Sequence, residues 1–255
     1  VLARGLRYTA ALLRRGIAVR TGVTPVAVEG QDRVAALRWR DGSGREHRTD
    51  CDALGLGYGL RSETQLADLA GCRFAFDPVA RQWLPELDPD GRSTVPGICL
   101  AGDGALVRGA DAAELAGRLA ACAALADLGL PVEPDEMARL RHALAPMTRF
   151  RRGLEGGFPW PAHLAAALPD GTIVCRCEAI TAGELRRAGR DLGASEVNRA
   201  KAFSRVGMGR CQGRMCGLAA AEILAAVRGE PVEAVGRLRG AAPVKPLPVR
   251  EEEPA

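Results

Sequence analysis

Four cysteines in the C-terminal part of the chain are spaced as two close pairs. Cys175 and Cys177 form a C-x-C motif, and Cys211 and Cys216 form a C-x4-C motif after a spacer of 33 residues. The second motif lies in the stretch MGRCQGRMCG, where three glycines and two arginines surround the cysteines. This composition is unsuited to the interior of a helix or strand and predicts a loop. Because thiolates held in pairs by loops are typical metal ligands, we expect these four residues to bind metal.

Zinc and an iron-sulfur cluster are the two candidates for that metal. Structural zinc is usually held by C-x2-C knuckles in both halves of its site, and the spacing here departs from that habit. A [2Fe-2S] cluster needs two thiolates on each iron and N-H donors directed at the sulfurs. The glycines favour the cluster because they let the backbone approach it closely, and a structural zinc domain is the alternative.

The elements predicted around the cysteines place each pair beside a helix N-terminus. Thr181 and Glu184 have the spacing of a capping box and start one helix. A second helix is predicted over 194–201, and a third over 217–228, stopped by Gly229. Backbone N-H groups and the helix dipole at such positions stabilise a thiolate.

Positive charge is concentrated in the same region. Residues 171–228 contain ten Lys or Arg and five Asp or Glu, a net charge of +5, while the whole chain carries +4. Four thiolates outweigh the charge of an iron core, so Arg176, Arg210 and Arg214 could neutralise the cluster and raise its potential. Nucleic-acid binding is the rival explanation. It is disfavoured because Phe203 is the only aromatic residue of the region and no recognition motif is present.

A second candidate site lies in the stretch STVPGICLAGDG. A strand predicted over 98–101 ends in Gly-Asp, and a long helix follows over about 110–128. The Asp103 carboxylate can accept a hydrogen bond from a ribityl hydroxyl, and the helix N-terminus can direct N-H groups at the N1 and C2 carbonyl edge of a flavin. The alternative is an ordinary Gly-Asp turn. The residues predicted to contact flavin are Gly102, Asp103, Gly104, Ala110 and Asp111.

The N-terminal part of the sequence predicts a helix followed by an antiparallel meander. The helix covers 2–15, and short strands are expected over 17–20, 24–30, 34–40 and 45–50. Residues 51–60, CDALGLGYGL, are expected to form a short strand that runs into a glycine-rich turn. Its G-x-G-x-G spacing differs from the G-x-G-x-x-G of a dinucleotide-binding loop. We therefore interpret these glycines as a tight crossing between two domains.

The order of these elements in residues 1–128 resembles the C-terminal part of flavoproteins with two dinucleotide-binding domains, of the pyridine nucleotide-disulfide oxidoreductase type. The resemblance rests on the meander, the CDALGLGYG crossover and the closing VPGICLAGDG segment. The family's βαβ unit with its G-x-G-x-x-G pyrophosphate loop is not found in this sequence. We therefore expect the back half of a longer flavoprotein, in which FAD binding requires that unit.

Residues 172–229 resemble the bacterioferritin-associated-ferredoxin-like [2Fe-2S] domain in VCRCE, ITAGEL and GMGRCQGRMCG. The CQGRxC spacing is similar to that of the alpha-type subunits of multimeric amino-acid and opine dehydrogenases, a group with opine oxidases, hydrogen cyanide synthase and dye-linked proline dehydrogenases. The resemblance implies a [2Fe-2S] cluster on Cys175, Cys177, Cys211 and Cys216, with FAD as second cofactor. It also implies a hetero-oligomer with a flavoprotein subunit that oxidises the C-N bond of an amino acid or opine. An electron acceptor completes the expected partners.

The expected fold class is α/β: a partial two-dinucleotide-binding-domain flavoprotein followed by a small, mainly helical [2Fe-2S] domain. The expected parts are the flavoprotein remnant (1–128), a helical linker (129–170) with a break at EGGFPWP, the [2Fe-2S] domain (171–230) and an extended proline-rich tail (231–255). The tail is either loose or an arm laid on the flavoprotein body or a partner subunit.

The expected function is electron transfer in a flavin and iron-sulfur oxidoreductase, and no residue of this chain is expected to be catalytic. A truncated, non-catalytic iron-sulfur binding or scaffold module is the alternative, and a nitrite-reductase-like flavoprotein is disfavoured by the missing C-x2-C. No apolar run of about 18 residues and no signal peptide are found, and eight cysteines without a signal peptide argue against a disulfide framework. These features predict a cytoplasmic protein without a membrane span.

Overall fold

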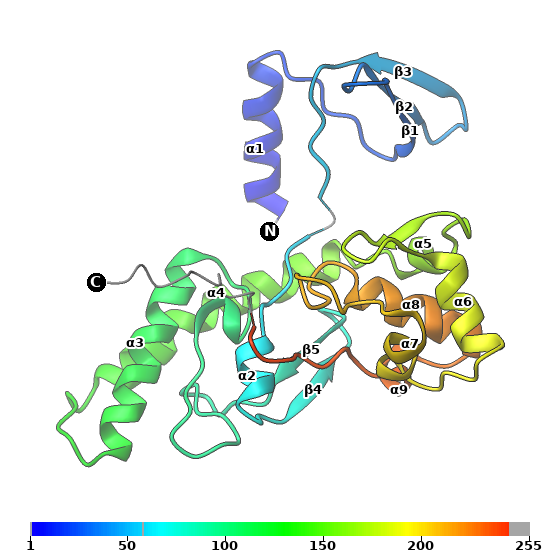
Figure 1. Cartoon of the computed structure of the whole chain (residues 1–255). Helices are drawn as coiled ribbons and strands as arrows, with labels where there is room; N and C mark the ends of the chain where they lie inside the picture. Colours follow the sequence, from blue (N-terminus) through cyan, green and yellow to red (C-terminus); the bar gives the residue numbers. More distant parts are fainter. Residues whose placement is uncertain (1, 58, 245–255) are drawn as a thin grey trace, which may run out of the picture. The chain divides into compact units, whose positions relative to one another are not determined.

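The computed structural model describes residues 2–57 and 59–244 (Figure 1). The chain divides into two compact units, Val1–Gly59 and Leu60–Ala255. The boundary falls at the last glycine of the G-x-G-x-G stretch. The domain boundaries expected at 128, 170 and 230 stay predictions. Among the described helices, none is both long and apolar enough to cross a membrane.

The first unit contains the expected antiparallel meander. Its elements are α1 (Leu2–Arg14), β1 (Thr24–Glu29), β2 (Ala36–Arg40) and β3 (Glu46–Asp50), with the strands in the order β1-β2-β3. Trp39 on β2 pairs with His47 on β3, their rings stack at 4.4 Å, and Trp39 Nε1 donates a hydrogen bond of 3.0 Å to Thr49. These contacts fix the register of β2 on β3.

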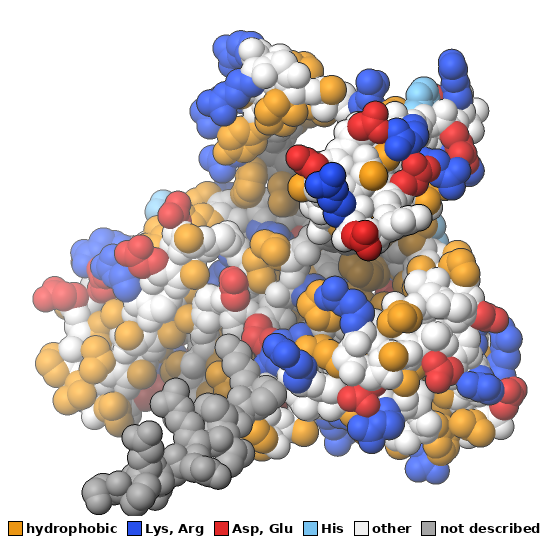
Figure 2. All heavy atoms as spheres, turned by 45° about the horizontal axis from the view of Figure 1, so that its top comes forward, with side chains coloured by type: hydrophobic (Ala, Val, Ile, Leu, Met, Phe, Trp, Pro, Cys, Tyr) orange, Lys and Arg blue, Asp and Glu red, His pale blue; other side chains and the backbone are white. Residues whose placement is uncertain are grey.

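Helix α1 buries none of its side chains in this structure. Leu2 and Leu6 are 76% and 62% exposed, and Figure 2 shows hydrophobic side chains along the helix surface. The apolar face of the helix therefore has no packing partner within the described part of this unit.

Two strands expected in this half of the chain are not formed. Residues 17–20 and 51–57 have no strand structure, and residue 58 lies outside the described residues. A strand requires a continuous ladder of hydrogen bonds to a neighbour, and in 51–57 the pairing stops after the bond of 3.1 Å from the Cys51 N-H to the Ala35 carbonyl. The strands predicted from the apolar composition of these two segments were therefore wrong.

The first part of the second unit places a hairpin and two long helices around the Gly-Asp segment. Its elements are α2 (Gln65–Leu69), β4 (Phe74–Asp77), β5 (Gln82–Pro85), the 3-10 turn η1 (Gly102–Gly104), α3 (Ala110–Asp127), α4 (Glu136–Gly157) and α5 (Ala162–Ala166). The strand predicted over 98–101 is reduced to an isolated bridge between Arg92 and Cys99. Its short pairing partner explains why the apolar run does not extend into a ladder.

Helices α3 and α4 pack against each other through small and aliphatic side chains. The buried contacts are made by Ala112, Ala116, Leu119, Leu140 and Leu144. Alanines on α3 let the two backbones approach closely. Helix α4 continues through Gly157, so the break expected over 155–161 was placed too early. Glu155 is one reason that the helix extends further than predicted. Its buried carboxylate forms an ion pair of 2.8 Å with Arg151 one turn earlier, which stabilises the helix at this position.

The C-terminal region of the second unit is a small helical bundle with a short hairpin. Its elements are β6 (Ile173–Cys175), β7 (Ile180–Thr181), α6 (Ala182–Arg190), α7 (Val197–Ser204), α8 (Gly217–Arg228) and α9 (Val232–Val235). Leu185, Val197, Ile223 and Leu224 lie in its core with at most 1% of each residue exposed. This core positions the loops that carry the four clustered cysteines.

The local helix signals of this region agree with the structure. Thr181 and Glu184 form both bonds of the expected capping box. Helix α8 ends at Gly229, which has the left-handed φ of 65° that favours glycine. Helix α7 begins later than the predicted residue 194, because the Glu196 carboxylate accepts the N-H of Asn198 and caps the helix there.

A buried ion pair joins this bundle to the β4–β5 hairpin. Glu222 on α8 is 7% exposed at its side chain, and it accepts hydrogen bonds of 2.7 and 3.2 Å from Arg81. Burial lowers the pKa of the nearby Arg61 to about 10, although the charge of Glu222 opposes that shift. The hairpin and the bundle are thus linked through a carboxylate that has little access to water.

Candidate iron-sulfur site

The four clustered cysteines lie on two loops that meet in the C-terminal region. Cys175 ends strand β6, Cys177 follows in the turn to β7, Cys211 lies in the loop before α8, and Cys216 is the residue that precedes the first turn of α8. Cys175 and Cys216 are buried, with 1% and 2% exposure, while Cys211 is partly buried and Cys177 is exposed. The site therefore has a buried side and a solvent side.

The thiols contact each other across the two loops. Cys175 is within hydrogen-bonding reach of Cys216, and Cys177 is within reach of Cys211. Each contact joins one cysteine of the C-x-C motif to one of the C-x4-C motif. We call Cys175 and Cys216 the inner pair, and Cys177 and Cys211 the outer pair.

The Cys216 thiol of the inner pair has an environment that disfavours a thiolate. Burial, together with the neighbouring Cys175 and Cys211, raises the pKa of the Cys216 thiol to about 12. Two negative charges at this depth require a cation to compensate them. The donor set thus fits a metal whose positive charge permits both sulfurs to be deprotonated.

The Cys211 thiol of the outer pair has the opposite tendency. Partial burial raises the pKa of the Cys211 thiol, but the N-H groups of Met215, Gly213 and Arg214 and the Cys177 thiol outweigh burial and lower it. These N-H groups face the Cys211 sulfur from the loop that leads into α8. Such donors are the second shell that an iron-sulfur centre requires.

Tight backbone geometry brings the two loops together. A Cβ at Gly209 would lie 2.2 Å from the Cβ of Cys177, so only glycine permits this approach. Ala179 and Gln212, each within two residues of a clustered cysteine, have positive φ values of 55° and 52°. Non-glycine residues in this conformation are uncommon and concentrate at functional sites.

Among the described residues, no group of three or more His, Cys, Asp or Glu side chains is arranged to hold a metal ion. A tetrahedral zinc site requires four sulfurs around one point, and a centre with two irons requires two sulfurs at each iron.

The three arginines expected to neutralise a cluster have different surroundings. Arg176 and Arg210 are exposed. Arg214 forms an ion pair with Glu63, and it donates hydrogen bonds of 3.2 Å to the Cys211 carbonyl and 3.0 Å to the Val244 carbonyl. The charge of Arg214 is therefore shared with a carboxylate that the sequence did not indicate.

The segment predicted to contact flavin is connected to the same carboxylate residue. Gly102, Asp103 and Gly104 form the turn η1, Asp103 is exposed, and its carbonyl accepts a 3.0 Å hydrogen bond from the N-H of Glu63. Glu63 thus contacts this turn through its backbone and the cysteine loop through its side chain. Ala110 and Asp111 are exposed at the first turn of α3, as expected. Their role as flavin contacts stays a prediction.

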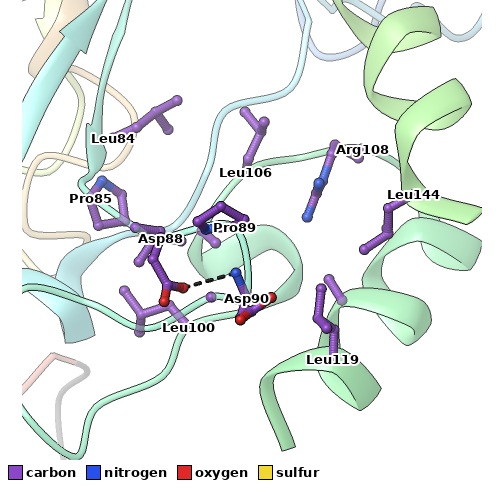
Figure 3. Close-up of a pocket in the computed structure, with 14 residues that line it drawn as sticks. Leu84, Pro85, Asp88, Pro89, Asp90, Leu100, Leu106, Arg108, Leu119 and Leu144 are labelled. Atoms are coloured by element: carbon purple, nitrogen blue, oxygen red, sulfur yellow. Dashed lines mark hydrogen bonds between the residues drawn. The ribbon is translucent and has the colours of Figure 1, made fainter. Parts of the chain in front are cut away.

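A cavity of about 300 Å³ adjoins this segment (Figure 3). Its walls include Leu84, Leu106, Arg108 and Leu119, and Figure 3 shows the Asp90 N-H donating to Asp88 at 2.9 Å on one side. Arg108 Nη1 donates to Thr148 at 3.3 Å, while its buried Nε has no partner among the described residues. Sequence reasoning missed this cavity because its walls come from well-separated segments.

Comparison with known proteins agrees with the expected family. Residues 173–226 match the family described as BFD-like [2Fe-2S] binding domain. The chain is 40% identical over 244 residues to an opine oxidase subunit of Agrobacterium tumefaciens (strain Ach5), a match that covers 94% of this chain and 48% of that protein. It is 31% identical over 261 residues to the HcnB subunit of hydrogen cyanide synthase from Pseudomonas protegens, covering 96% of this chain and 53% of that protein.

A solved structure has the same fold. The L-proline dehydrogenase from P. horikoshii matches with a TM-score of 0.69 and 20% identity, over 95% of this chain and 46% of that one. This confirms the expected fold class, and the domain match confirms the expected [2Fe-2S] cofactor. The chain spans about half the length of the curated relatives named above. By these comparisons, the chain is similar to these opine oxidase and hydrogen cyanide synthase subunits over about half of their length.

Proposed function

We propose that this chain is the electron-transfer part of a flavin- and iron-sulfur-dependent oxidoreductase. Cys175, Cys177, Cys211 and Cys216 hold a [2Fe-2S] cluster, which when bound supplies one-electron transfer. The observation that carries the proposal is the contact of the four thiols in an inner and an outer pair within a BFD-like domain.

The inner pair would supply the buried ligands of the cluster, and the outer pair would supply the ligands closer to solvent. Met215, Gly213 and Arg214 direct their N-H groups at the outer pair and stabilise negative charge on its sulfurs. Because electron transfer requires access to a partner, we propose that electrons leave or enter on the exposed Cys177 side.

FAD is the proposed second cofactor. Gly102, Asp103 and Gly104 would approach the ribityl chain, and the α3 N-terminus at Ala110 and Asp111 would face the ring edge. Glu63 supports a direct connection between the two cofactor sites, since it bonds to the Asp103 carbonyl and to Arg214 of the cysteine loop. Its proposed task is to keep these two segments at a fixed separation.

The proposed partner is a flavoprotein subunit that oxidises the C-N bond of an amino acid or opine. Support comes from the relatives, which are named as subunits of an opine oxidase and of hydrogen cyanide synthase. The chain's own residues would then receive and pass on electrons without binding the substrate. The cytoplasm is the proposed compartment, because none of the eight cysteines forms a disulfide.

An anaerobic absorption and EPR titration of the chain tests this function. After reconstitution with iron and sulfide, we expect two irons per chain, visible absorption that bleaches on reduction, and an EPR signal from one electron per cluster. Reduction of the cluster by the substrate-reduced partner subunit would establish the electron-transfer role. A colourless chain with stoichiometric zinc, or a cluster that no partner reduces, would contradict the proposal and favour a structural or scaffold module.

A further inference from the structure

The segment after α9 is an arm that crosses the cysteine loop. We define the arm as residues 236–244; its chain is drawn in red where it passes α2 and β5 in Figure 1. Asn198 on α7 holds it from one side, donating to the Arg237 carbonyl at 2.9 Å and accepting the Arg239 N-H at 2.9 Å. These two bonds flank Leu238 and fix the direction of its side chain.

The other side of the arm is tied to α2 and β4. Asp68 accepts hydrogen bonds of 2.7 Å from Arg237 Nη2 and 2.7 Å from the Gly240 N-H. The Arg237 guanidinium lies 3.9 Å from the centre of the Phe74 ring. The arm is therefore bonded to two separate parts of the second unit. The expected extended tail over 231–255 is helical at α9, and its residues 245–255 lie outside the described residues.

Leu238 packs onto glycines of the cysteine loop. A Cβ at Gly207 would lie 2.5 Å from Leu238 Cδ1, and one at Gly213 would lie 2.7 Å from the same atom. The corresponding distance at Gly217 is 3.5 Å. Leu238 thus occupies the space that side chains would fill on three glycines, and its shape is matched to bare backbone.

The backbone under Leu238 is the same backbone that faces a cysteine sulfur. Gly213 is in contact with Leu238, and its N-H group and those of Arg214 and Met215 face Cys211. Gly213 is buried and has a φ of 81°, so few other residues could adopt its place in the turn. Movement of Leu238 would leave this turn free to rotate its N-H groups away from the sulfur.

We propose that Leu238 is a positioning residue for the iron-sulfur site, holding the 211–217 turn so that its N-H groups stay directed at the Cys211 sulfur. This inference rests on the proposed function of the four cysteines as cluster ligands. N-H donors to a ligand sulfur stabilise the extra electron of the reduced centre and so raise its reduction potential. The arm therefore sets the potential although it supplies no ligand.

The test compares Leu238→Ala with the wild-type chain and two further variants. Leu238→Met keeps an apolar side chain of similar volume that can adapt to the same space, so it is the conservative variant. Leu192→Ala removes the same atoms from the turn after α6, where the side chain is 53% exposed and lies in another segment. All four chains are reconstituted anaerobically, and the cluster potential is measured by EPR-monitored redox titration.

We expect Leu238→Ala to lower the potential and to lose its cluster about tenfold faster in air, since the turn opens more often without its packing partner. Leu238→Met and Leu192→Ala should keep the wild-type potential. An unchanged potential in Leu238→Ala would overturn the inference. A raised potential would also overturn it, because that result means the side chain acts by excluding water.

A second variant separates packing from backbone strain. Gly213→Ala should destabilise the cluster both through its positive φ and through contact with Leu238. In the Leu238→Ala background only the first effect remains, so the added loss of cluster lifetime should be smaller. Equal effects in both backgrounds would contradict the packing role. Failure of the wild-type chain itself to bind a cluster would instead contradict the proposed function.

Discussion

The C-terminal region (residues 171–235) and helix α1 differ in how they bury hydrophobic side chains. Seventeen buried residues form one core in the C-terminal region, while α1 buries none of its own. The loops that carry the four clustered cysteines are attached to the C-terminal region, which has this core. A site whose elements share a core of their own is positioned by that core, whereas α1 contributes no buried contact to the unit in which it lies.

The largest effect is expected from replacing one of the four clustered cysteines, a change that leaves the N-terminal unit unaltered. Cys216→Ser removes one sulfur of the inner pair, and we expect nearly complete loss of the visible absorption and of bound iron. Cys51→Ser is the matched control, because Cys51 is a partly buried thiol outside the C-terminal region. The measurement is iron per chain together with the absorption spectrum. Full iron content in Cys216→Ser would show that the cluster uses other ligands.

A packing comparison tests the difference between the two regions directly. Leu185→Ala creates a cavity at a residue with 0% exposure and should lower the free energy of unfolding by about 2–5 kcal/mol. Leu6→Ala in α1 should change it by less than about 0.5 kcal/mol, because the side chain is largely exposed. Urea titrations followed by circular dichroism measure both values. Similar losses in the two variants would mean that α1 has a buried partner.

The link between the bundle and the β4–β5 hairpin should have an intermediate effect. Glu222→Ala leaves Arg81 unpaired, and we expect a loss of about 2–3 kcal/mol, at the low end for buried pairs because Arg81 is 31% exposed. Glu230→Ala removes a more exposed carboxylate that pairs with Arg228 and should shift the urea midpoint much less, because solvent screens this pair. The difference in urea midpoint between the two variants is the measurement. If both midpoints move equally, the buried pair does not stabilise the chain.

The smallest expected effect concerns the capping box of α6 and its dependence on pH. The Thr181 N-H and then its hydroxyl lower the pKa of Glu184 below its usual value of 4.5. The stabilisation is therefore complete above that pH and is lost as the pH falls through the lowered pKa. Glu184→Gln should reduce stability by about 1 kcal/mol near neutral pH, since it removes the charge from the cap.

The corresponding measurement is the free energy of unfolding of both chains from neutral to acidic pH. The difference between wild type and Glu184→Gln should shrink as the pH falls. Glu233→Gln at the start of α9 is a suitable control, because its carboxylate belongs to a different helix. A constant difference across the range would mean that the charge of Glu184 does not contribute.

Local signals in the sequence predicted the C-terminal region well. The Thr181 and Glu184 spacing, the stop at Gly229 and the glycine-rich loop before α8 depend on residues near each other in the chain. Segments 17–20 and 51–60 were less predictable, because apolar composition cannot tell whether a neighbouring strand is available.

The parts of the site that sequence reasoning missed depend on distant residues. Glu63 and Arg214 are separated by 151 positions, and Asp68 and Gly240 by 172. Neither pair has a local pattern that distinguishes it from ordinary surface charge. Gly213 and Gly217, which Leu238 contacts, lie in the stretch MGRCQGRMCG. From the sequence, the glycines of this stretch were attributed to metal binding alone. Contact with the arm is a second reason for glycine at those positions.

Cys216 has a consequence for helix α8 that goes beyond ligation. It occupies the capping position, but its side chain accepts no hydrogen bond from the first turn, in which the Gly217 N-H donates to the Gly213 carbonyl. A sulfur that carries negative charge on iron would stabilise the N-H groups of residues 218 and 219 electrostatically. We therefore expect release of iron to make these two amide hydrogens exchange faster with solvent deuterium. The first turn of α6 should exchange at an unchanged rate, because its own capping residues remain in place.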